Sequence, residues 1–162
     1  MYRKVYILYI MYTYDKIGGE KGEMIMQEIL NATDVRKHWS QFNDDVVREG
    51  PRFVKRNRDH WAALSANHLK VALSQFSFNI SYFKEEDKTV TAKLEGFDIV
   101  ENGDTKEEAL SLVVDELIEY ANEYQENFNL YFNAPNRREH FPYILNVLVQ
   151  DDSEGVKGLI HA

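Results

Sequence analysis

A set of basic and polar residues between positions 31 and 58 has the chemistry to bind nucleic acid. Arginine can contact base edges as well as phosphates, asparagine can read a base edge, and lysine suits phosphate oxygens. These residues surround the start of a predicted helix and a predicted hairpin turn, which would form one basic surface if they pack together. Solvated charges at a hairpin tip are the alternative. The candidate DNA-binding residues are Asn31, Thr33, Arg36, Lys37, Lys55, Arg56 and Arg58.

Arg36 has the most specific context of this set. The stretch 29–36 is expected to run from a strand into a helix, with Thr33 as the N-cap. Arg36 would then lie in the first helical turn, where the helix dipole disfavours a cation. Helix stability would not explain such an arginine, whereas an anion bound there would, because free N–H groups and the guanidinium would both face it. A solvated surface arginine is the alternative.

Candidates for metal or catalytic chemistry are few. No two histidines have ligand spacing on one helix face, so we expect no metal site. Three acids, Asp98, Glu101 and Asp104, could gather a divalent cation for a metal-dependent hydrolase, but acids in turns and at helix N-caps usually have structural roles. There is no nucleophile motif and no phosphate-binding glycine loop. We therefore expect no enzyme activity and no cofactor. The histidines are His38, His60, His68, His140 and His161.

Composition points to a globular chain in a reducing compartment. The 162 residues include no cysteine, which excludes disulfides, thiol nucleophiles and cysteine-based zinc sites. The apolar, tyrosine-rich residues 1–14 are too short to span a bilayer as a helix. We expect a cytoplasmic protein that does not contact a membrane.

The charge is distributed unevenly along the chain. The formal net charge is -8, but residues 26–75 carry +2 and residues 76–135 carry -10. A mildly basic front half and a strongly acidic back half suggest two domains with different partners.

The elements that would position the basic residues can be read from residues 26–75. Apolar residues at three-to-four spacing predict a helix over 34–49, which Gly50 and Pro51 end. A polar turn, 57–59, separates two strands and predicts a hairpin. Ser65 is expected to cap a second helix. The predicted strands are 27–32, 52–56 and 60–64.

This region resembles the Phd/YefM antitoxin family over about residues 26–73. The matching words are Met-Gln-Glu-Ile-Leu-Asn-Ala-Thr-Asp-Val-Arg from residue 26, Asp-Asp-Val-Val-Arg-Glu-Gly-Pro from residue 44, Phe-Val-Lys-Arg from residue 53 and Ala-Ala-Leu-Ser from residue 62. The resemblance implies that Arg36 contacts operator DNA and that Arg56 is a second basic contact. Ala66 and Leu69 stand where the family often has leucine and tyrosine.

The second half shows alternating apolar residues and then a long helical stripe. Strands are predicted over 76–82, 90–94 and 97–99, and a helix capped by Asp104 and Glu107 runs to about Tyr124. A polar link follows over 126–133, and further short helices follow to the C-terminus. The word Phe-Asp-Ile-Val-Glu-Asn-Gly-Asp-Thr-Lys-Glu-Glu-Ala-Leu, from residue 97, makes residues 76–125 resemble the HicB antitoxin fold. The Pro-Gly-Cys element of that family is absent.

The predicted fold class is therefore α+β. A Phd/YefM-like β-α-β-β-α domain for DNA binding and dimerisation (26–75) would precede a HicB-like domain (76–130) with a three-stranded antiparallel sheet and a long helix. Residues 131–162 would form a C-terminal helical segment. Residues 1–25 are interpreted as a leader from a mis-assigned start, because Lys-Gly-Glu at 21–23 could be encoded by a purine-rich ribosome-binding site ahead of Met24 and Met26.

These resemblances imply an antitoxin of a type II toxin–antitoxin system. The front domain would bind operator DNA as a homodimeric autorepressor, and the acidic rear would neutralise a basic cognate toxin. A transcriptional regulator with a sensing domain and no toxin is the alternative.

Overall fold

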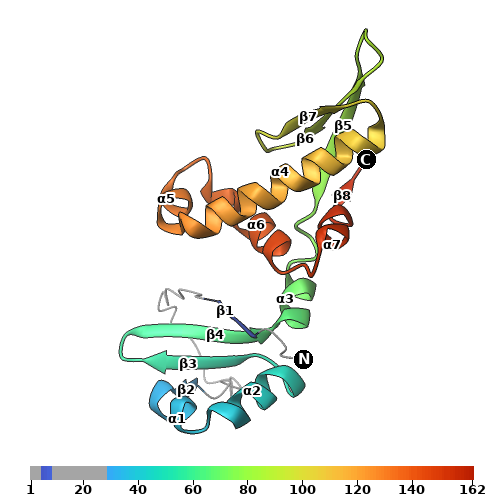
Figure 1. Cartoon of the computed structure of the whole chain (residues 1–162). Coiled ribbons are helices and arrows are strands. Elements are labelled where there is room, and N and C mark those ends of the chain that lie inside the picture. The colour runs from blue at the N-terminus through green and yellow to red at the C-terminus, as the bar shows by residue number, and fades with distance from the viewer. Residues whose placement is uncertain (1–4, 9–28) are drawn as a thin grey trace, which may run out of the picture. The chain divides into compact units, whose positions relative to one another are not determined.

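A computed structural model describes residues 5–8 and 29–162, with side chains described for residues 29–162. The chain forms two compact units, residues 1–69 and 70–162, and each contains its own sheet (Figure 1). The predicted α+β class is confirmed. No helix in the described ranges combines the length and the apolar character needed to cross a membrane.

The first unit is built on a four-stranded sheet with the order β1-β4-β3-β2. The predicted hairpin is confirmed: β3 and β4 are antiparallel, and Asn57 takes a positive φ of 54° in the turn between them. The β2 strand is parallel to β3. The strands are β1 (Val5–Leu8), β2 (Ile29–Asn31), β3 (Arg52–Arg56) and β4 (Asp59–Ser65).

The β1 strand forms an unpredicted edge of this sheet and pairs antiparallel with β4. The leader interpretation of residues 1–25 falls mostly outside the described residues, which include only Val5–Leu8 of that segment.

The helix predicted over 34–49 is two helices, α1 (Ala32–Lys37) and α2 (Trp39–Arg48). The single-helix prediction is wrong because His38 leaves the helical region, with φ -118° and ψ 40°. Val35 from α1 and Phe42 and Val46 from α2 still pack into one core with the sheet, on which both helices lie (Figure 1). The next helix, α3 (Ala66–Ala72), begins as predicted after Ser65, whose Oγ accepts a hydrogen bond from the His68 N–H.

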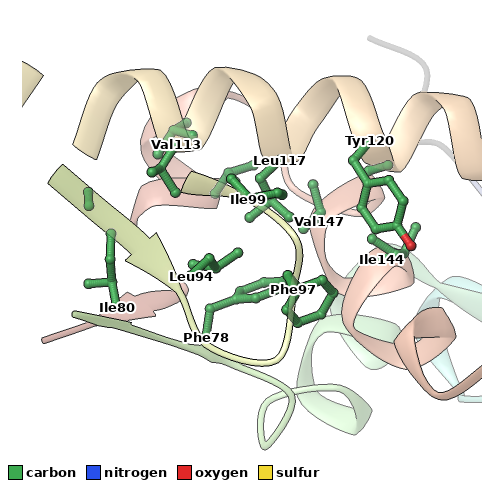
Figure 2. Close-up of a cluster of buried hydrophobic side chains, with 14 of the residues drawn as sticks. Phe78, Ile80, Leu94, Phe97, Ile99, Val113, Leu117, Tyr120, Ile144 and Val147 are labelled. Carbon is green, nitrogen blue, oxygen red and sulfur yellow. The ribbon is translucent and has the colours of Figure 1, made fainter. Parts of the chain in front are cut away.

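The second unit has a four-stranded sheet with the order β7-β6-β5-β8. Its third strand lies three residues later than the predicted 97–99. Gly96 turns the chain with φ +77°, and the side chains of Phe97 and Ile99 enter the core beside Phe78 and Leu94 (Figure 2). The strands are β5 (Phe78–Lys84), β6 (Val90–Leu94), β7 (Val100–Gly103) and β8 (Ile160–His161).

The long helix α4 (Lys106–Glu126) covers this sheet with a stripe of buried residues that includes Val113 and Leu117 (Figure 2). Its length agrees with the prediction, but the cap is shifted by one residue. Thr105, not Asp104, is the N-cap: its Oγ1 accepts from the Glu108 N–H, and Glu108 Oε2 accepts from the Asp104 N–H. This arrangement is similar to a capping box, except that the returning bond goes to the residue before the N-cap, and it satisfies two backbone donors.

Short elements complete the second unit. The polar link predicted over 126–133 is wrong, because α5 (Phe128–Asn133) follows α4 directly and packs Phe128 on Phe132 and Phe141. The C-terminal segment is not purely helical, since β8 pairs in parallel with β5. The remaining elements are η1 (Arg138–His140), α6 (Phe141–Leu148) and α7 (Ser153–Lys157).

Candidate nucleic-acid interface

Asn31 caps the helix that follows β2, so the expected role of Thr33 as the N-cap is wrong. Asn31 Oδ1 accepts a hydrogen bond from the Thr33 N–H at 2.9 Å, and Thr33 is the second residue of α1. The Asn31 side chain is thus engaged in capping, which satisfies a backbone donor that would otherwise be free. Thr33 remains exposed at the same helix end.

Arg36 lies in the last turn of the six-residue α1, not in the first turn. The helix dipole therefore favours Arg36 rather than disfavouring it as predicted, because the C-terminal end of a helix favours a cation. Arg36 is exposed. It also lines an open, mainly apolar cavity of about 190 Å³ with Ala32, Val35, Trp39 and Trp61.

Two tryptophans and a phenylalanine form an aromatic row beside Arg36. Trp39 stacks on Phe42 with ring centroids 5.7 Å apart, and Phe42 meets Trp61 edge-on at 6.1 Å. Trp39 is 49% exposed although it is a large apolar side chain. The cavity between this row and Arg36 was not anticipated, because it joins α1 to a strand 25 residues further along the chain.

The basic residues of the hairpin do not all face the same way. Val54 is fully buried under the helices, and strand residues alternate between faces, so Arg56 lies on the helix side of the sheet and Lys55 on the other side. Arg58 lies in the exposed turn. The expectation of one shared basic face is therefore corrected to a basic end of the sheet that presents cations on both sides.

The end of the sheet that carries these cations also carries the start of α1. Asn31 is the register partner of Lys55, since β2 and β3 run parallel, and α1 begins at the next residue. The hairpin turn and the β2–α1 junction are therefore close together. Figure 1 shows α1 below the turn end of β3 and β4.

In the part of the chain that the structure describes, one of the five candidate lysines and arginines has an acidic partner. Lys37 is paired with Asp34 at 3.6 Å, and both side chains are about two-thirds exposed, so this pair contributes little to stability. Within residues 29–162, no carboxylate forms an ion pair with Arg36, Lys55, Arg56 or Arg58. Four exposed, unneutralised cations at one end of a unit can attract a polyanion.

The three acids considered for a metal site each have a different contact or position in the fold. Asp98 is 3.9 Å from the Arg137 guanidinium, Glu101 is a β7 residue opposite Ala92, and the Asp104 backbone N–H donates to Glu108 Oε2. In the part of the chain that the structure describes, no three histidine or acidic side chains are grouped to hold a metal ion.

Comparisons with known proteins agree on one class. Residues 26–162 match a PHD-like family described as the antitoxin of a RelE/RelB toxin–antitoxin system. A crystal structure of an antitoxin part of a proposed toxin/antitoxin system from Syntrophomonas wolfei subsp. wolfei is 37% identical in sequence. That match has a TM-score of 0.78 and covers 83% of this chain and 96% of the other. No curated protein matches the chain. The chain therefore belongs to this PHD-like family of toxin–antitoxin antitoxins.

Proposed function

We propose that this antitoxin binds operator DNA through its first unit as a homodimer and represses its own synthesis in the cytoplasm. The observation that carries the proposal is the set of exposed cations around the β2–α1 junction and the hairpin turn, most of which have no acidic partner among the described residues. The Phd/YefM resemblance of residues 26–73 supports the same assignment. Arg36 would contact a base edge or a phosphate, while Lys37, Lys55, Arg56 and Arg58 would contact phosphates.

The homodimer is supported by apolar surface on the same unit. Trp39 is 49% exposed and Ile29 is 47% exposed, although both are large apolar side chains. A second copy would cover such residues, and a two-fold dimer would present two basic ends to two DNA half-sites.

The second unit is proposed to neutralise the cognate toxin. Its three antiparallel strands followed by a long helix support the HicB-like interpretation. The strong negative charge of residues 76–135 would attract a basic toxin and raise the rate of association.

The proposal is tested by fluorescence anisotropy with the full chain and a labelled duplex from upstream of its own gene. We expect specific binding whose logarithm falls linearly with the logarithm of salt concentration, with a slope of about -0.9 for each phosphate contacted. An unrelated duplex of equal length is the control. Equal affinity for both duplexes, or no binding at low salt, would contradict operator recognition.

A further inference from the structure

A cavity in the second unit has a chemical character that the DNA-binding proposal does not use. It measures about 190 Å³ and lies where α4 meets the loop before β7 and the segment after α4. Its polar lining consists of three carboxylates, two phenols and one guanidinium, which are Asp98, Glu116, Glu123, Tyr120, Tyr131 and Arg137. Within this lining, three negative charges face one positive charge, so the cavity carries a net negative charge.

One cation already lies against the aromatic wall of this cavity. The Arg137 guanidinium carbon is 5.2 Å from the Tyr120 ring centroid and 5.7 Å from the Tyr131 ring centroid, both within the range of a cation–π interaction. Its Nη2 is 3.9 Å from Asp98 Oδ2, the long end of an ion pair. Arg137 therefore engages Asp98 and the two rings, and among the described residues it forms no ion pair with Glu116 or Glu123.

Of the two α4 carboxylates that line the cavity, Glu123 is held in place by a hydrogen bond. Tyr131 donates a hydrogen bond to Glu123 Oε1 at 2.7 Å, which orients that carboxylate. Among the described residues, neither Glu116 nor Glu123 forms an ion pair. A preoriented carboxylate beside two aromatic rings suits a guanidinium or an ammonium group.

Glu116 and Glu123 of this cavity belong to a helix face whose composition is not explained by helix stability. Leu112, Glu116, Glu119 and Glu123 repeat at three-to-four spacing on α4 and are all exposed. Like charges at this spacing destabilise a helix by roughly 0.2–0.5 kcal/mol per pair. A cationic partner on this face would remove that repulsion.

We propose that this cavity receives a lysine or arginine side chain of the cognate toxin, with Glu116 and Glu123 as its acidic partners, next to the two tyrosine rings that Arg137 already contacts. The inference rests on the toxin-neutralising role proposed for the second unit. Charge complementarity selects the occupant: the cavity and the adjoining helix face are both acidic, and a basic side chain supplies the opposite charge.

The experiment uses the isotope-labelled full chain and Nα-acetyl-L-arginine amide as the probe, followed by NMR chemical-shift changes. We expect saturable shifts at Tyr120, Tyr131 and their neighbours, and none with the uncharged Nα-acetyl-L-citrulline amide. Glu116→Gln should weaken the binding of the probe by about tenfold, because the loss of one charge-assisted hydrogen bond lowers an affinity by about this factor. Glu119→Gln is the matched control, because Glu119 lies on the same helix face but does not line the cavity.

Three results would overturn the proposal: no shifts with the arginine probe, equal shifts with the citrulline probe, or equal weakening by Glu116→Gln and Glu119→Gln. Saturable binding of spermidine at this cavity without binding of the arginine probe would assign it to a free polyamine and would also overturn it. The assay contains no DNA, so its failure would leave operator binding untouched, and loss of operator binding would leave this result untouched.

Discussion

Asn31 at the end of β2 is the direct register partner of Lys55 near the end of β3. Because the two strands are parallel, this pairing brings the first turn of α1 and the hairpin turn to the same end of the sheet. The basic residues of both segments thereby surround one end of the first unit. The fold, rather than the sequence spacing, brings them together.

Replacing the cap residue should destabilise the first unit. Asn31→Ala removes the acceptor of the Thr33 N–H and should lower the free energy of unfolding by about 1 kcal/mol. Asn31→Asp should retain most of the stability, because aspartate caps equally well. Urea unfolding followed by circular dichroism measures both. Equal losses for Asn31→Ala and Thr33→Ala would contradict the assignment of Asn31 as the cap.

Gly103 is required by a close approach between β7 and α4. A Cβ added at Gly103 would lie 2.6 Å from the Ala109 backbone nitrogen, which cannot move aside easily. Gly103→Ala should therefore lower the free energy of unfolding by about 1–3 kcal/mol. Gly158→Ala is the matched control, since its nearest non-bonded atom would be 3.4 Å away. Equal melting temperatures for the two variants would refute this packing argument.

The second unit should lose stability in mild acid because of His140. The His140 ring lies 4.3 Å from the Phe97 ring and its Nδ1 is 2.8 Å from the Tyr120 hydroxyl. Burial, and then the nearby Arg137 charge, lower the pKa of His140 below its ordinary value of 6.5, although Asp98 and Glu139 act in the opposite direction. Between the two pKa values the unfolded chain binds more protons than the folded chain, so stability is complete above about pH 6.5 and falls as the pH drops below it.

Urea unfolding at pH 7.5, 6.5 and 5.5, followed through spectroscopic signals from the second unit, measures this effect. His140→Gln should flatten the dependence over this window, because glutamine does not titrate and its amide can still bond to the Tyr120 hydroxyl. A wild-type stability that is constant from pH 7.5 to 5.5 would contradict the argument.

Elements with strong local signals could be predicted from the sequence. The Asn57-Arg58-Asp59 turn between two apolar runs predicted the β3–β4 hairpin, and the apolar stripe from Ala109 to Ala121 predicted α4. The break at His38 could not be seen, because the apolar stripe continues through both helices: Val35, Phe42 and Val46 enter the same core. The third strand of the second unit was misplaced because Phe97 and Ile99 alternate as strand residues do, although a turn at Gly96 directs them inward.

The functional surfaces depend on contacts between distant segments. Arg36 could be identified as a candidate, but its neighbour Trp61 lies on β4, and only the folded sheet places the two around one cavity. The acidic cavity is likewise assembled from the loop before β7, α4 and the segment after it. Spacing along the chain carries no signal for such assemblies. The two-residue strand β8 is also too short to give a pattern.

The most direct test of the account compares Arg36→Ala with Arg48→Ala in operator binding by the full chain. Each variant removes one exposed arginine, but Arg48 lies at the C-terminal end of α2, near the start of β3 and away from the hairpin turn. Anisotropy titrations should show that Arg36→Ala weakens operator binding by about tenfold to a hundredfold, with an unchanged melting temperature, while Arg48→Ala binds as the wild type does. Equal operator affinities for wild type, Arg36→Ala and Arg48→Ala would contradict the proposal that this end of the sheet holds the DNA.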